Sequence, residues 1–147
     1  MLEARFRGFL AESFAILQRE VPAAYAALCR LLTPQEVTLT MDQEPVAIRF
    51  EQEHARLLHA SDAPTIEVCT DRTLVLDLID ARCTLHEAVL SDRLLLRGRP
   101  EALLLFHDGL MLYLHGALRA PSFPTLLQWF RLAPRSAGSP TIAEESA

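Results

Sequence analysis

Between Val37 and Cys69 the hydropathy of the chain alternates with a period of two residues, the pattern of strands with one buried face. Four runs alternate in this way, over residues 37–41, 46–50, 55–59 and 65–69, and turn-forming residues separate them. Because the connections are short, the pattern predicts an antiparallel meander of four strands. Its buried face is expected to carry Val37, Leu39, Met41, Ile48, Phe50, Ile66 and Val68.

Helical spacing replaces this alternation on both sides of the strands. Apolar residues from Leu2 to Val21 fall on one helical stripe, and Pro22 suits the first position of a second helix. Pro34 stops that second helix, because the residue before a proline avoids the helical region. The first third of the chain therefore predicts two helices joined at a proline.

Two helix caps and a fifth strand are expected after the meander. Asp71 can cap one helix, and Thr84 with Glu87 has the T-x-x-E form of a capping box for a second. Three leucines followed by Arg97 predict a strand over 94–97, and Pro100 suits the start of a long helix. The order of elements predicts an α+β fold with a five-stranded, largely antiparallel sheet, covered by helices on one face.

The C-terminal region predicts a last helix over about residues 123–132, followed by a disordered tail over 133–147 that is rich in Pro, Ser, Gly, Ala and Glu. We therefore expect one domain over residues 1–132. Within it, residues 1–34 form the N-terminal helix pair and residues 37–132 form the core.

The amino-acid composition argues against several classes of binding partner and of chemistry. The net charge of −5 provides no basic surface for nucleic acid or for anionic lipid headgroups. All fourteen basic residues are arginine, an absence of lysine that suggests a GC-rich, bacterial coding bias and removes lysine-based chemistry. Three cysteines without CxxC spacing favour a reducing compartment, and the N-terminus lacks a signal-peptide pattern. These features predict a cytoplasmic protein without an integral membrane segment.

The long helix after Pro100 is apolar all round, over residues 102–106 and 110–114. Such a helix must be covered on more than one side, and a single sheet covers only one. The second cover could be the N-terminal helices, a bound lipid or a second subunit.

Catalytic motifs are absent from the sequence. Neither the five histidines nor the three cysteines follow a known metal-ligand or nucleophile spacing, and GxSxG, HExxH, GxGxxG and P-loop patterns are missing. We therefore expect no catalytic residues, no metal and no cofactor.

The stretch from Val37 to Trp129 resembles the sterol carrier protein-2 family of lipid-binding domains. The order of elements matches, and the segments over 65–71 and 88–98 are similar to that family's passages from strand to helix cap and from turn to strand to glycine. This resemblance implies a sheet with helices on one face and a hydrophobic tunnel between the layers. It also implies a non-catalytic lipid binder that assists other proteins, for example in quinone synthesis.

The function expected from the sequence is binding or carriage of an apolar ligand such as a lipid, fatty acyl or isoprenoid chain. The residues expected to line the tunnel are Met41, Ile48, Phe50, Leu96, Leu103, Phe106, Leu110 and Trp129. Arg49 or Arg97 could hold an acidic headgroup, although a solvated arginine on a strand is the simpler interpretation. The alternative is an interaction or regulatory subunit whose apolar surface is buried by a homodimer or an enzyme partner.

Overall fold

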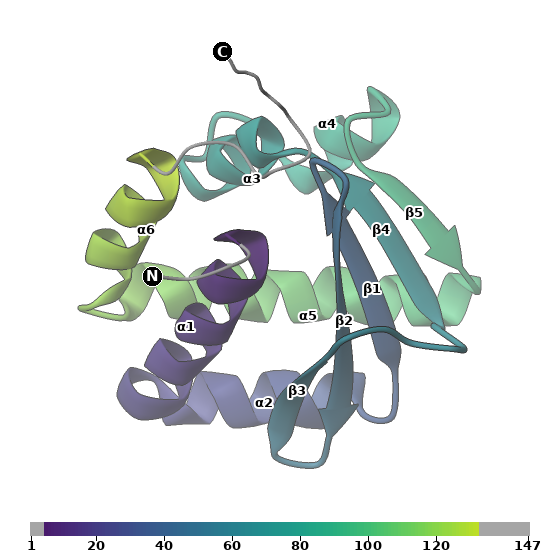
Figure 1. Cartoon of the computed structure of the whole chain (residues 1–147), viewed down its shortest axis with the longest axis horizontal. Coiled ribbons are helices and arrows are strands. Elements are labelled where there is room, and N and C mark those ends of the chain that lie inside the picture. Colours follow the sequence, from purple (N-terminus) through teal and green to yellow (C-terminus); the bar gives the residue numbers. More distant parts are fainter. Residues whose placement is uncertain (1–4, 133–147) are drawn as a thin grey trace.

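The computed structural model describes residues 5–132 as a five-stranded sheet with six helices (Figure 1). The elements in chain order are α1 (Arg5–Glu20), α2 (Pro22–Leu32), β1 (Glu36–Met41), β2 (Glu44–Glu51), β3 (His54–Leu58), β4 (Ile66–Thr70), α3 (Arg72–Ile79), α4 (Leu85–Leu90), β5 (Leu95–Gly98), α5 (Pro100–Arg119) and α6 (Phe123–Leu132). The α+β class is confirmed, as are the N-terminal helix pair and the fifth strand. The expected tail over 133–147 lies outside the described residues.

The sheet has the strand order β3-β2-β1-β4-β5. Three of its four pairings are antiparallel, but β4 runs parallel to β1, with Val37 opposite Ile66. The prediction that the fourth strand continues an antiparallel meander is therefore wrong. The sheet remains largely antiparallel, as expected.

The physical reason lies in the loop between β3 and β4. Crossing from β3 to the far side of β1 spans three strand spacings, roughly 14 Å, and seven extended residues reach roughly 23 Å. The loop is therefore long enough for β4 to lie either beside β3 or beside β1, and hydrogen bonds to Glu36 favour the position beside β1. The Thr65 amide donates to the Glu36 carbonyl oxygen at 2.8 Å, and Ser61 donates to the Glu36 carboxylate. These bonds hold the loop at the start of β1.

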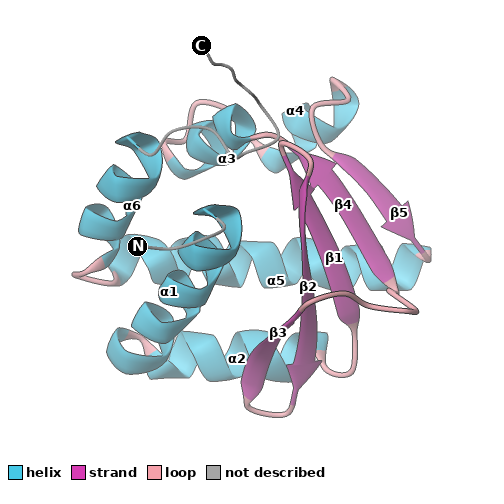
Figure 2. Cartoon of the chain, in the orientation of Figure 1, coloured by secondary structure: helices cyan, strands magenta, loops and turns pink. Residues whose placement is uncertain are grey.

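Helices cover one face of the sheet, and the helical layer extends well beyond the sheet on one side (Figure 2). Helix α5 runs without interruption through His107, Asp108 and Gly109. At Gly109 a Cβ would lie 2.7 Å from Leu32 Cδ1, and at Gly116 it would lie 3.3 Å from the Ala24 Cβ. The two glycines thus permit α2 to pack closely and in antiparallel orientation against α5.

Side-chain caps hold the short helices as the sequence predicted. Asp71 accepts a hydrogen bond from the Leu74 amide at 2.8 Å at the start of α3. Thr84 and Glu87 form both bonds of the capping box at the start of α4. The structure adds a cap that the sequence did not suggest, because Glu44 accepts hydrogen bonds from two amides in the first turn of α1.

Helix α6 is attached to the rest of the molecule at both ends. At its start, Glu20 of α1 accepts hydrogen bonds from the amide and hydroxyl of Ser122. At its end, the Arg131 guanidinium makes two hydrogen bonds of 3.0 Å to Asp80, which lower the pKa of that carboxyl group. Between these points, Phe130 stacks on Phe9 at 4.1 Å between ring centroids. Within residues 5–132, no helix is long and apolar enough to cross a bilayer.

Candidate ligand-binding cavity

A cavity of about 120 Å³ lies between the sheet and the helices. The sheet side is formed by Val37, Leu39, Ile48, Phe50, Val68 and Thr70. The helical side is formed by Phe6, Phe9, Leu10 and Phe14 of α1, Leu28 and Leu32 of α2, Val75, Leu78 and Ile79 of α3, and Phe106, Gly109, Leu110, Tyr113 and Leu114 of α5, with Leu94 before β5. Residues of four helices and three strands therefore meet around one space.

The lining is almost entirely hydrocarbon. Among the described residues, only Thr70 and Tyr113 bring hydroxyl groups to it, and none of the described residues of the wall is charged. The Tyr113 hydroxyl donates to Ser13 Oγ at 2.8 Å, and Ser13 in turn donates to the Leu10 carbonyl oxygen. Burial raises the pKa of Tyr113 to about 12, so its hydroxyl stays neutral. Such a cavity favours hydrocarbon and provides no site for a charged group.

Helix α1 forms a wall of the cavity. Its N-terminal turn is held by Glu44, and Arg7 donates to the Leu58 carbonyl oxygen of β3 at 2.9 Å. Farther along, Phe14 contacts Tyr113 edge-on at 5.8 Å between ring centroids. These contacts fix the aromatic side of α1 toward the sheet and toward α5.

Four of the eight residues expected to bind ligand come together at the cavity, namely Ile48, Phe50, Phe106 and Leu110. The other four lie elsewhere. Met41 is buried at the end of β1, and Leu96 is opposite Val68 at the edge of the sheet. Leu103 packs near Gly98 at the start of α5, and Trp129 is a half-buried residue of α6.

The residues missed from the sequence come chiefly from α1 and α3. The stripe of Phe6, Phe9, Leu10 and Phe14 was visible as the apolar side of a helix. Periodicity shows that such a side is buried, but it does not show which element it faces. Val75 and Leu78 of α3 could likewise be recognised as residues of an apolar helix side, but not as residues that face a cavity.

The two arginines considered for a headgroup lie outside the cavity lining. Arg49 is bonded to the Glu36 carboxylate at 2.8 Å, across β1 and β2. Arg97 is largely exposed, with Glu67 at 3.8 Å. Both arginines are therefore solvated and paired with acidic side chains of the neighbouring strand.

The cysteines and histidines are dispersed. Cys29 is fully buried, and burial raises the pKa of its thiol, which disfavours the reactive thiolate. Cys69 is exposed on β4 and Cys83 is half-buried. No group of three or more His, Cys, Asp or Glu side chains within residues 5–132 is arranged to hold a metal ion.

Comparison with solved structures gives the fold. The chain superposes on a structure described as "UbiJ-SCP2 Ubiquinone synthesis protein" with a TM-score of 0.60 and 15% identity, covering 76% of this chain and 90% of that one. It also superposes on sterol carrier protein domain 2 of Helicoverpa armigera, with a TM-score of 0.58 and 10% identity over 80% of this chain and 91% of the other. The chain has the sterol carrier protein-2 fold.

The sequence comparisons, unlike the structural one, do not identify a family. No known family model matches the chain, and a search among curated proteins finds no significant match. The sterol carrier protein-2 fold here combines the expected sheet with a cavity between the sheet and helices α1, α2, α3 and α5.

Proposed function

We propose that this protein binds the hydrocarbon part of a lipid, fatty acyl or isoprenoid molecule in the cavity and holds it without chemical change. In this proposal it serves as a cytoplasmic accessory factor in lipid or quinone metabolism. The observation that carries the proposal is the continuous apolar lining, which is built from four helices and the sheet.

Two further observations support it. One solved structure of this fold is described as a ubiquinone synthesis protein, and another as a sterol carrier protein domain. The described residues of the cavity wall also include no acid–base pair, because their hydroxyls are those of Thr70 and Tyr113 and the latter is bonded to Ser13. Holding a ligand requires only burial, which stabilises by about 25 cal/mol per Å² of apolar surface.

The size of the cavity determines how the ligand enters. A cavity of about 120 Å³ is close to the roughly 150 Å³ of an engineered apolar cavity that holds benzene. A long chain therefore needs more room, and the wall must move to provide it. Val75 and Leu78 of α3 are only partly buried, whereas Phe9 of α1 is 1% exposed, so we expect the α3 side of the wall to yield first.

Displacement of a fluorescent fatty acid by unlabelled lipids tests the proposal, together with mass spectrometry of an organic extract of the purified protein. Val75→Phe places a larger side chain in the wall and should weaken binding while the protein stays folded. Phe106→Ala enlarges the cavity and should shift the preference toward longer or bulkier chains. Leu104→Ala is the matched control, because Leu104 lies two residues away on α5 but is 69% exposed.

Two results would contradict the proposal. The first is the absence of both a co-purified lipid and any displacement with the wild-type protein. The second is an identical effect of Phe106→Ala and Leu104→Ala on binding, which would show that the cavity wall does not contact the ligand.

A further inference from the structure

The outer side of α5 carries three apolar residues that the fold leaves uncovered or half-covered. Leu104 is 69% exposed and Leu118 is 64% exposed, and the half-buried Met111 lies midway between them. Residues seven apart lie within about 20° of one another around a helix. The three side chains therefore form a straight row, here called the outer row, on the side of α5 opposite the cavity residue Phe106.

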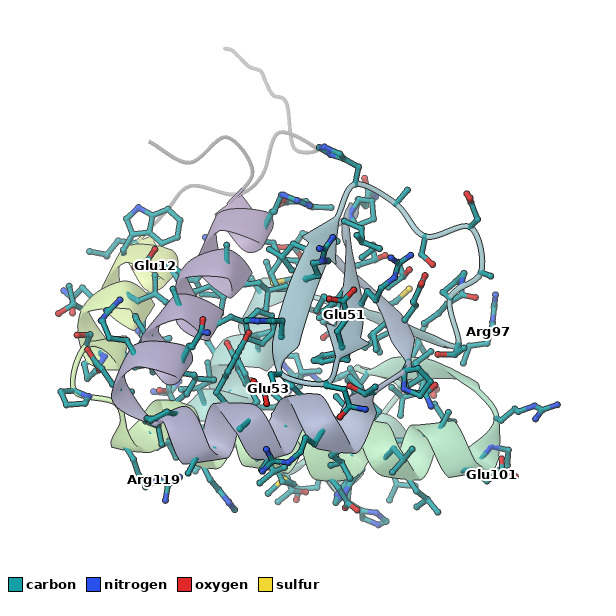
Figure 3. All side chains as sticks on the ribbon, turned by 90° about the horizontal axis from the view of Figure 1, so that it is seen from below. Glu12, Glu51, Glu53, Arg97, Glu101 and Arg119 are labelled. Atoms are coloured by element: carbon teal, nitrogen blue, oxygen red, sulfur yellow. The ribbon has the colours of Figure 1, made fainter. Side chains whose placement is uncertain are left out.

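Polar and charged residues accompany the outer row along one side. At about 100° per residue, Glu101, Asp108, His115 and Arg119 all lie within about 60° of Leu104, in the same rotational direction. All four are exposed. Figure 3 shows Glu101 and Arg119 at opposite ends of α5, both directed away from the body of the molecule. The acidic residues occupy the N-terminal half of this side, and the basic residues occupy the C-terminal half.

This arrangement is self-complementary when α5 of a second copy lies antiparallel to the first. A two-fold axis through Met111 places Leu104 against Leu118 of the second copy, and Met111 against its equivalent. The axis also places the flank that carries Asp108 and His115 beside the same flank of the second helix, so that Asp108 lies opposite His115 of the second copy. Their heights along the helix then differ by about 1.5 Å, the rise of one residue.

The same operation brings Glu101 near Arg119 of the second copy, and by symmetry each of these pairs forms twice. A two-fold interface must be self-complementary in this way, since each residue meets the symmetry-related position. Within its own chain, Asp108 contacts only the neighbouring His107, at 3.2 Å, among the contacts that the structure records. That exposed pair is easily exchanged for a pair with the second copy.

We infer that this protein forms a homodimer through an antiparallel pairing of α5 with α5 of a second copy, centred on Met111. This inference goes beyond the proposed binding function, because the outer row and the cavity wall lie on opposite sides of the helix. The paired face is roughly 30 Å long, the length of twenty helical residues, and roughly 10 Å wide. That is smaller than the roughly 800 Å² per partner of a standard interface, so we expect a weak, reversible dimer.

The competing occupant is a membrane surface. An amphipathic helix that binds membranes carries basic residues beside its apolar row. Here the outer row is flanked by the acidic Glu101 and Asp108 as well as by His115 and Arg119, and the chain has a net charge of −5. The charges beside the outer row therefore favour a second copy of the chain.

Sedimentation velocity of the full-length protein over a series of micromolar concentrations tests the inference. The wild type should show a reversible monomer–dimer equilibrium. Leu104→Glu should raise the dimer dissociation constant roughly tenfold or more, because it places two charges in the buried interface. Leu90→Glu is the matched control, since Leu90 is a 71% exposed leucine on α4, and it should leave the equilibrium unchanged.

A charge exchange tests the orientation of the two helices. Asp108→His and His115→Asp should each weaken the dimer, because each pairs like residues across the two-fold axis. The double variant restores opposite partners and should recover the wild-type dissociation constant. A merely structural effect of either substitution would add in the double variant.

Four outcomes would overturn the inference. The first three are a monomer at every concentration, a dimer that tolerates Leu104→Glu, and a double variant weaker than both single variants. Binding of the wild type, but not of Leu104→Glu, to vesicles of anionic phospholipid without dimer formation would assign the outer row to a membrane and equally overturn it. Affinity for a fluorescent fatty acid should be the same in all of these variants.

Discussion

The buried hydroxyl pair of Tyr113 and Ser13 predicts a specific loss of stability at alkaline pH. Tyr113 belongs to α5 and Ser13 to α1, so their hydrogen bond of 2.8 Å joins two walls of the cavity. Ser13 is fully buried, and burial raises the pKa of Tyr113 from 10.0 to about 12. Ionising Tyr113 in the folded protein would place an anion in an apolar cavity wall.

The sign of the effect follows from the proton that the folded state retains. Between pH 10 and pH 12 the unfolded chain has lost the Tyr113 proton while the folded chain still holds it. The stabilisation is therefore complete below the unfolded pKa and is lost as the pH rises toward the folded value. Since each pKa unit corresponds to about 1.4 kcal/mol, Tyr113 accounts for a loss of roughly 3 kcal/mol over this window.

Urea unfolding of the wild type and of Tyr113→Phe at a series of pH values measures this contribution. At neutral pH the variant should lose about 1 kcal/mol, the usual net value of one hydrogen bond. The difference should shrink and then reverse above pH 10, because phenylalanine has no proton to lose. Some alkaline loss will remain in the variant, since burial also raises the pKa of Tyr25.

Ser13→Ala provides the complementary measurement. It leaves the Tyr113 hydroxyl buried without its partner and should cost about 1 to 3 kcal/mol at neutral pH, more than Tyr113→Phe. Parallel stability curves of wild type and Tyr113→Phe from pH 8 to pH 12 would refute the reasoning, because they would show that Tyr113 titrates at the same pH in the folded and unfolded chains.

Three further substitutions test the fold. Gly98→Ala places a Cβ 2.8 Å from the carbonyl oxygen of Thr65 and should cost about 1 to 3 kcal/mol in thermal or urea unfolding. Phe9→Ala removes a ring that is 1% exposed and stacked on Phe130, and should cost about 3 to 5 kcal/mol in urea unfolding. Thr84→Ala removes a capping box at the surface and should cost only about 1 kcal/mol in the same assay.

Local structure was predictable where a single side chain determines it. Asp71 and Thr84 each accept a hydrogen bond from a backbone amide three residues farther along the chain, so each cap is encoded within one short segment. Pro22 and Pro100 mark helix starts for the same reason. The class of fold followed from these local features together with the alternation over the strands.

Pairing at long range was not predictable in the same way. The parallel pairing of β4 with β1 depends on how the loop after β3 bonds to Glu36, which is 25 residues from Ser61 in the chain. The cavity had the same limitation. Ile48 and Phe106, both expected to line a tunnel, are among the cavity residues, but the facing side of α1 depends on tertiary contacts such as that between Arg7 and Leu58.

Helix α5 shows why a helix can be apolar on all sides in a folded protein of this size. One side, at Gly109 and Gly116, is covered by close packing against α2 and the end of α1. A second side, including Phe106 and Tyr113, faces the cavity and α1.

The third side of α5 is the outer row of Leu104, Met111 and Leu118, which the described part of the chain leaves largely uncovered. The sequence left three covers open for this helix, namely the N-terminal helices, a ligand and a second subunit. In the structure, the N-terminal helices cover the side of α5 that carries Gly109 and Gly116. The two proposals place the ligand against the side of Phe106 and the second subunit against the outer row. Because Phe106 and Leu104 point in opposite directions, a change at one should affect ligand binding and a change at the other should affect dimer formation. Loss of both activities through either change alone would mean that the two sides are coupled through the helix.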